Sequence, residues 1–215
     1  LFGKSVITSL ARVDGRGVGI IANQPYFNAG AMDTDGIDKV ISFLCLCDSY
    51  NIPLLFFHDT PGFLVGKEAE RKRVGARVMN YMNALGQITV PKISIIVRKT
   101  YGMAFWNMAG SGCAAEFLVA WPTAEMSFVD PEIAANVVFG GKLQNSPNPA
   151  AQREKLVQQL IEDSAPYPAA GMHYIHDVID PRETRDYIMR ALEICQNRKT
   201  GGIGEHRLAN WPTKF

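Results

Sequence analysis

Apolar and polar positions along this chain of 215 residues follow two different periods. Residues 5–13 alternate as in a half-buried strand, residues 14–17 (DGRG) supply turn residues, and residues 18–23 are apolar again. This pattern predicts a β-hairpin. Residues 52–59 and 91–97 are short, continuous apolar runs between turn residues, which is typical of strands buried on both faces of a parallel sheet.

Segments with helical spacing separate the apolar runs. Asp33 or Thr34 is a suitable N-cap for a helix through Tyr50. Further helices are expected at 67–88, 104–112, through Phe139, within 145–164 and at 181–199, and shorter strands at 117–121, 124–129 and 173–180. Strands interleaved with helices indicate an α/β fold with largely parallel pairing. Residues 140–150 are the best candidate for a linker, and we expect them to join elements of one fold. Residues 201–215 are expected to form an irregular tail.

Composition removes several classes of function. A formal net charge of +1 gives no electrostatic reason to expect nucleic acid or an anionic membrane surface as a partner. No apolar run approaches the roughly 20 residues that span a bilayer, so membrane insertion is not expected. The four cysteines form no CxxC pair, which favours reduced thiols in a cytosol or organelle matrix over zinc or disulfides. We also find no signal peptide, and the missing initial methionine suggests a fragment or a processed product.

Three short motifs resemble nucleotide-binding sequences but lack the required context. The glycines of residues 15–22 precede a β-type run, whereas a dinucleotide fingerprint needs a strand before it and a helix within it. Residues 62–68 (GFLVGKE) have one residue too few for a P-loop and no magnesium-binding Ser or Thr. Residues 56–62 (FFHDTPG) look like a GTPase switch, but neither a Walker motif nor NKxD is present. We therefore do not predict nucleotide binding.

Reactive side chains are equally unpromising. The histidines His58, His173 and His176 lie at strand ends, where packing or solvation is the simpler explanation. Glu132 is expected to be a first-turn carboxylate stabilised by a helix dipole. Neither GxSxG nor HExxH occurs, so hydrolytic and metal chemistry have no support, and no metal site is predicted.

The main chain of residues 97–110 (VRKTYGMAFWNMAG) is the remaining candidate. It has the pattern of a strand-to-helix junction without a nucleophile, histidine or carboxylate. Gly102 lets the chain turn out of the strand, and the amides of Met103 and Ala104 would open the helix, where N–H groups are unpaired and carry partial positive charge. On the residues alone, a tight strand–helix connection with core packing is the favoured explanation of the junction.

Several stretches together resemble the carboxyltransferase (β) subunits of biotin-dependent acyl-CoA carboxylases, of the propionyl-CoA and acetyl-CoA carboxylase type. They are 11–25, 47–66 (with DTPGFLVG), 75–105 and 117–128 (with LVAWPTAEMS). The related sodium-pump decarboxylases for glutaconyl-CoA and similar acids share much of the pattern, and VRKTYGMA and EIAANVVF lean towards them.

The resemblance implies a crotonase-like (ClpP-type) ββα superhelix. It implies that residues 1–215 are the carboxy-terminal, biotin-side half, with the amino-terminal CoA-side domain absent and the fragment inactive alone. In that family the active site forms where the first domain of one protomer faces the second domain of another. The whole enzyme would move a carboxylate from carboxybiotin to the α-carbon of a short-chain acyl-CoA. Its implied partners are a biotin carboxyl carrier, a biotin carboxylase subunit and further copies of itself, as a hexamer.

The same resemblance assigns roles at the site. Carboxyl transfer develops negative charge on carbonyl oxygens, and preorganised N–H donors stabilise it by roughly 2.7–4 kcal/mol each. The implied residues are Gly102 with the N–H donors of Met103 and Ala104, and, as substrate-binding residues, Gly62, Phe63, Phe105 and Trp106. Met103 stands where the family commonly has a second glycine, and Trp106 where it often has a smaller or acidic residue. Two alternatives stay open: a biotin-dependent acyl-CoA decarboxylase, and a non-catalytic assembly or binding module with the same fold.

Overall fold

The computed structural model describes residues 2–113, 115–141, 147–197 and 206–210. Its sheet runs in the order β1-β2-β3-β4-β5-β7, with β6 paired to β4. The strands are β1 (Val6–Val13), β2 (Arg16–Asn23), β3 (Leu54–Thr60), β4 (Lys92–Tyr101), β5 (Phe117–Ala120), β6 (Glu125–Ser127) and β7 (Asp177–Val178). Only β1 and β2 pair antiparallel, and the remaining pairs are parallel. The predicted α/β class and largely parallel sheet are confirmed.

The β1–β2 hairpin turns at two residues with left-handed backbone. Asp14 has φ 51° and Gly15 φ 75°, the conformation that a two-residue hairpin turn needs for its twist to match that of the strands. The register pairs Val13 with Arg16. The predicted hairpin is thus confirmed.

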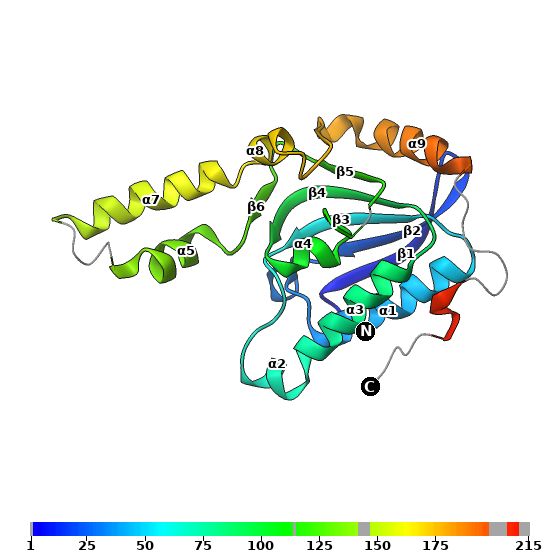
Figure 1. Cartoon of the computed structure of the whole chain (residues 1–215), viewed down its shortest axis with the longest axis horizontal. Helices are drawn as coiled ribbons and strands as arrows, with labels where there is room; N and C mark the ends of the chain where they lie inside the picture. Colours follow the sequence, from blue (N-terminus) through cyan, green and yellow to red (C-terminus); the bar gives the residue numbers. More distant parts are fainter. Residues whose placement is uncertain (1, 114, 142–146, 198–205, 211–215) are drawn as a thin grey trace.

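Helices cover both faces of the sheet (Figure 1). The helices are α1 (Thr34–Ser49), α2 (Lys67–Arg71), α3 (Val74–Gln87), α4 (Met103–Asn107), α5 (Pro131–Val138), α7 (Pro149–Asp163), α8 (Pro166–Gly171) and α9 (Thr184–Ile194). Buried side chains of α1 and α3, such as Leu44 and Tyr81, form one core with Phe56 of β3. Ile188 and Leu192 of α9 pack in a second core on other sheet residues.

Asp33 confirms its expected role as the N-cap of α1. Its carboxylate accepts a hydrogen bond from the main-chain N–H of Gly36 at 2.8 Å. The apolar positions at helical spacing, Val40, Ile41 and Leu44, are all fully buried. The local pattern and the tertiary packing therefore agree for this helix.

Three expected elements differ in the structure. The helix predicted at 67–88 is broken into α2 and α3, because Arg73 adopts a left-handed conformation with φ 57°. The strand predicted at 173–180 contains only the two residues of β7. The final helix begins with a 3₁₀ turn at Pro181–Glu183. The predicted end of this helix lies outside the described residues, and so does part of the expected linker at 140–150.

Two helices extend away from the sheet, and we call them the α5–α7 arm (Figure 1). Arg153 of α7 donates to Asn136 of α5 at 2.9 Å, and its guanidinium lies 3.7 Å from the carboxylate of Glu132. None of the residues of α7 is buried. The arm is thus held together mainly by contacts between its own two helices.

The ends of β3 and β4 bring two loops to one edge of the sheet. The register shifts between His58 and Thr60, after which Thr60 pairs with Thr100. Beyond this point β4 no longer pairs with β5 but with β6, from Lys99 to Tyr101. The loops that follow Thr60 and Tyr101 therefore leave the sheet side by side.

Gly30 provides a test of the packing behind this edge. It has φ 86°, and a Cβ atom there would lie 2.3 Å from the carbonyl oxygen of Asp59 in β3. We expect Gly30→Ala to lower the free energy of unfolding by about 1–3 kcal/mol, measured by urea denaturation. Gly17→Ala is the control, since a Cβ there meets nothing within 4 Å. Equal stability of the two variants would contradict the packing described.

Candidate active site

The junction between β4 and α4 depends on the backbone of Gly102. Its φ of 57° and ψ of −139° lie in a region that residues with a Cβ rarely adopt. Its N–H donates to the carbonyl of Ser127 at 2.9 Å, and its carbonyl accepts from the N–H of Phe105 at 3.2 Å. A Cβ on Gly102 would also approach the carbonyl oxygen of Phe128 to 3.0 Å. Both the backbone conformation and the lack of space for a Cβ atom therefore favour glycine at position 102.

The two amides after Gly102 have no acceptor within the described part of the protein. The N–H groups of Met103 and Ala104 open α4, and neither forms a hydrogen bond there. The two residues differ in access, because Met103 is 40% exposed whereas Ala104 is fully buried. Of these two residues, Met103 is therefore the one that solvent or a ligand can reach.

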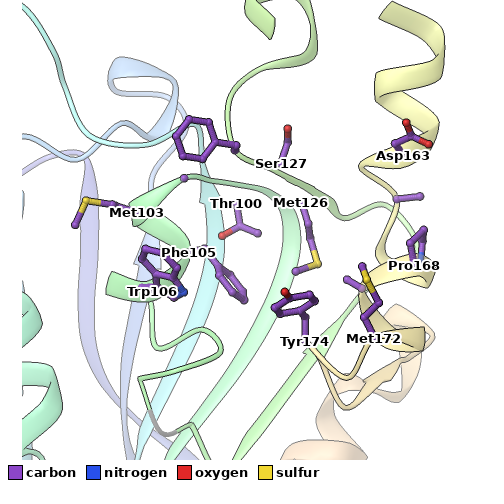
Figure 2. A pocket seen from close by; sticks show the side chains of 14 residues that line it. Thr100, Met103, Phe105, Trp106, Met126, Ser127, Asp163, Pro168, Met172 and Tyr174 are labelled. Carbon is purple, nitrogen blue, oxygen red and sulfur yellow. The ribbon is translucent and has the colours of Figure 1, made fainter. Parts of the chain in front are cut away.

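Gly102 and Met103 form part of the wall of a cavity of about 450 Å³ (Figure 2). Other side chains of the wall come from α4, from β6 and the residue after it, and from the segment around α8: Phe105, Trp106, Met126, Ser127, Phe128, Pro168, Met172 and Tyr174. Most of these side chains are apolar, so the cavity has a largely hydrophobic wall beside the unpaired N–H of Met103. Asp163 is the single charged residue of its lining.

A buried histidine supports α4 from beneath. His58 is fully buried, its Nδ1 lies 3.1 Å from the hydroxyl of Thr100, and its ring centroid is 6.2 Å from that of Phe105. Burial lowers the pKa of His58 to about 3, although hydrogen bonding to the main chain of Met108 acts in the opposite direction. His58 is therefore neutral at neutral pH, and the expectation that it is a packed histidine is confirmed.

The structure brings together most, but not all, of the predicted site residues. Gly102, Met103, Phe105 and Trp106 line one cavity, whereas Ala104 is fully buried and is not part of its wall. The far wall, formed by β6 and the α8 segment, was not predicted, because nothing local in that irregular sequence indicates which cavity it faces.

Gly62 and Phe63 are absent from the wall of this cavity. The carbonyl of Gly62 accepts from the N–H of Met32 at 3.0 Å, and the carbonyl of Met32 accepts from Leu64 at 2.9 Å. These bonds hold the loop against the segment before α1, and Phe63 packs on the core there. Gly62 and Phe63, predicted to be substrate-binding residues, therefore lie in a loop that packs against the core and outside the wall of this cavity.

Other charged groups near the edge are already paired. Arg98 donates through Nε to Asp59 at 3.0 Å, and Lys99 lies 3.9 Å from the carboxylate of Asp130. No group of three or more His, Cys, Asp or Glu side chains suited to a metal ion occurs among the described residues. In the same ranges, no helix has the length and apolar character needed to cross a bilayer.

Comparison with known proteins gives consistent matches. The model of the carboxyl transferase domain family matches residues 1–207. The carboxyltransferase subunit of propionyl-CoA carboxylase from Haloferax mediterranei is 37% identical over 199 residues, covering 92% of this chain and 39% of that protein. The alpha subunit of methylmalonyl-CoA decarboxylase from Propionigenium modestum is 38% identical over 199 residues, covering 92% of this chain and 38% of that protein.

A solved structure of transcarboxylase 12S is similar as well. It superposes with a TM-score of 0.87 at 37% sequence identity, covering 92% of this chain and 38% of the 12S chain. Its description names a hexamer assembly and bound methylmalonyl-coenzyme A. With the sheet described above, this match identifies the crotonase-like fold. The chain spans about two fifths of the length of each of these relatives.

The buried His58 predicts a specific dependence of stability on pH. The unfolded chain takes up a proton near pH 6.5, whereas the folded protein does so only near pH 3, so acid favours unfolding. Between these values, His58 should reduce the free energy of unfolding by about 1.4 kcal/mol per pH unit. Urea denaturation between pH 7 and 4 measures this slope.

The matched variants are His58→Asn and His173→Asn, the latter at an exposed position. His58→Asn should reduce the slope of the free energy of unfolding against pH by the amount that corresponds to nearly one proton. His173→Asn should leave this slope close to that of the unsubstituted protein. If His58→Asn keeps the full slope, the histidine is not held neutral by burial.

Proposed function

The chain belongs to the carboxyl transferase family, and we propose that it forms part of an enzyme transferring a carboxyl group from carboxybiotin to the α-carbon of a short-chain acyl-CoA. In this proposal, residues 1–215 are the carboxy-terminal, biotin-side half of a longer subunit, which fits their coverage of about two fifths of the relatives. The observation that carries the proposal is the unpaired N–H of Met103 at the wall of an apolar cavity.

The cavity suits the chemical groups of biotin. A largely apolar wall accommodates a hydrophobic bicyclic ring, and an unpaired N–H at its edge suits the ureido oxygen of that ring. When bound, carboxybiotin would supply the activated carboxyl group from a separate carrier protein. The residues that would hold its ring are Gly102, Met103 and Phe105, whereas Trp106 would lie towards the acyl group of the CoA thioester.

The contribution of this chain is electrostatic rather than acid–base. The Met103 N–H would donate a hydrogen bond to a carbonyl oxygen as negative charge develops there. Such a bond would stabilise the transition state by roughly 2.7–4 kcal/mol. The Ala104 N–H has no acceptor among the described residues either and would be a second donor, although Ala104 itself is fully buried. The apolar wall would exclude water and so strengthen these interactions.

No side chain at the cavity is arranged as a general base. His58 is buried below α4 with a pKa of about 3, and it does not line the cavity. Asp163 lies at the C-terminal end of α7, on an exposed part of the lining. Main-chain donors therefore suit the proposed reaction better than a titrating residue of this chain.

The wider setting follows from the same proposal. The CoA thioester would be held by the amino-terminal half of another protomer, and a biotin carboxyl carrier and a biotin carboxylase subunit would supply the loaded cofactor. A hexamer would be the complete assembly. The four free cysteines suit a reducing compartment, the cytoplasm or the mitochondrial matrix of a eukaryote.

A second function shares the same site. The similarity to a methylmalonyl-CoA decarboxylase subunit supports the reverse direction, in which an acyl-CoA loses its carboxyl group to biotin. One set of donors serves both directions, because the charge develops on the same oxygens. The alternative to an enzyme is a non-catalytic assembly or binding module with the same fold. The observation that favours such a module is the bulk of the Met103 and Trp106 side chains at the cavity.

Gly102→Ala tests the main-chain donors. A Cβ at this φ is strained and meets the Phe128 carbonyl, so the turn and the following N–H groups should shift. We expect kcat for transfer from biotin-loaded carrier to propionyl-CoA to fall about 100-fold in protein expressed from its complete reading frame. Gly112→Ala is the matched control, with φ 86° but no atom within 4 Å of the added Cβ.

Thermal denaturation should show both glycine variants to be folded at the assay temperature. Equal values of kcat for the two variants would contradict the proposed role of the turn at Gly102. Absence of transfer in the unsubstituted protein, for every acyl-CoA tested, would favour the assembly module.

Trp106→Ala tests acyl selectivity. Trp106 is partly exposed in the cavity wall, and its removal should enlarge the space beside α4. We expect kcat/KM for longer acyl-CoA substrates to rise about tenfold relative to acetyl-CoA. Tyr26→Ala, at an exposed aromatic residue outside the cavity, is the control. An unchanged ratio across chain lengths would contradict this role for Trp106.

A further inference from the structure

The side chains of Tyr101 and Glu125 join β4 to β6 beside the Gly102 turn. Tyr101 is the last residue of β4 and is 1% exposed, and its hydroxyl donates to the carboxylate of Glu125 at 2.5 Å. Such a short distance is typical of a hydrogen bond to a charged acceptor. Burial raises the pKa of Tyr101, and the hydrogen bond to Glu125 and the carboxylate of Asp130 raise it further. The hydroxyl therefore remains a donor at neutral pH.

The strand that this bond holds to β4 is short. β6 contains three residues, and Ser127 is the last of them. The main-chain carbonyl of Ser127 accepts the hydrogen bond from the Gly102 N–H at 2.9 Å. Because such a short strand forms few main-chain hydrogen bonds, contacts between side chains of the two strands contribute strongly to their alignment. A shift of β6 would therefore move the acceptor that fixes the Gly102 turn, and with it the N–H of Met103.

The Tyr101–Glu125 bond and the cavity lie on opposite faces of this strand pair. Successive side chains of a strand point to opposite faces. Thr100 and Met126 are neighbours in the register of β4 and β6, and both line the cavity (Figure 2). Tyr101 and Glu125 are not part of its wall. The pair can therefore influence a ligand in the cavity only through the main chain.

A second contact on the same face is weaker. The ammonium group of Lys99 lies 3.9 Å from the carboxylate of Asp130 and 5.6 Å from the centroid of the Tyr101 ring. Both members of the Lys99–Asp130 ion pair are partly exposed, and exposed ion pairs contribute little to stability. The hydrogen bond of the buried tyrosine is therefore the main side-chain link between the end of β4 and β6 among the described residues.

We propose that the hydrogen bond between Tyr101 and Glu125 positions the Gly102 turn for carboxyl transfer, so that both are positioning residues. The bond holds β6, and therefore the Ser127 carbonyl, at the place that orients the Met103 N–H. Displacing a catalytic group by about 1 Å can lower a rate about 100-fold, so even a small shift of the turn is measurable. The inference rests on the proposed function, because the turn affects catalysis only if the Met103 N–H is a donor in the reaction.

Tyr101→Phe tests the bond, because it removes the hydroxyl and keeps the buried ring. We expect kcat for transfer from biotin-loaded carrier to propionyl-CoA to fall about tenfold in protein expressed from its complete reading frame, as for the loss of one hydrogen bond to a charged group. KM for propionyl-CoA should stay within about twofold, because the interaction lost does not contribute to substrate binding. Tyr50→Phe is the matched control, at an exposed tyrosine at the end of α1.

Variants of Glu125 separate the hydrogen bond from the packing of the tyrosine ring. Glu125→Ala removes the acceptor and should lower kcat as Tyr101→Phe does, whereas Glu125→Gln keeps an acceptor oxygen and should restore most of kcat. Combining Tyr101→Phe with Glu125→Ala should lower kcat no further than either change alone, since both remove the same bond. Losses that multiply in the double variant would show that the two residues act separately, and would overturn the proposal.

Hydrogen exchange of the Gly102 amide reports on the turn without turnover. This N–H is bonded to the Ser127 carbonyl, so it should exchange at least about fivefold faster in Tyr101→Phe than in the unsubstituted protein or in Tyr50→Phe. Unchanged exchange of this amide in Tyr101→Phe would overturn the proposal even if kcat fell, because the bond would then not act through the turn.

The two proposals can fail separately. If the unsubstituted protein transfers no carboxyl group to any acyl-CoA, the proposed function is wrong, and the exchange of the Gly102 amide alone decides whether the bond positions the turn. If transfer occurs and kcat of Tyr101→Phe equals that of Tyr50→Phe, the proposed function stands and the positioning role of Tyr101 is wrong.

Discussion

The hydrogen bond from the Gly102 N–H to the Ser127 carbonyl is the interaction on which the candidate site depends. It holds the end of β4 beside the end of β6 and fixes a backbone conformation that favours glycine. The chain then turns directly into α4, so the N–H groups of Met103 and Ala104 have no acceptor among the residues that the structure describes. An unpaired donor near an apolar cavity costs stability unless something binds it, and such donors are common where a ligand or transition state supplies the missing acceptor.

The side chains beneath this turn are buried and carry no charge. His58 and Thr100 meet beneath α4, and the low pKa of His58 means that no charge appears there at neutral pH. The paired ends of β3 and β4 fix where the two loops begin. A site built in this way relies on preorganised dipoles, because His58 is buried without charge and Arg98 forms an ion pair with Asp59.

Exposed apolar side chains lie both in the cavity wall and on α5. Phe128, which precedes α5, lines the cavity and is 85% exposed, and Val137 and Val138 of α5 are exposed as well. Exposed apolar surface of this kind usually marks an interaction site.

Features that depend only on neighbouring residues could be predicted from the sequence. The hairpin at Asp14 and Gly15, the N-cap at Asp33, the buried strands and the glycine at the β4–α4 junction were all predictable, because each follows from local backbone preferences or from the period of apolar residues. Tertiary structure alone decided the break at Arg73, the opposite wall of the cavity, the separation of Phe63 from that cavity and the burial of Ala104. Those outcomes depend on contacts between segments far apart in the chain, and no local pattern of residues encodes such contacts.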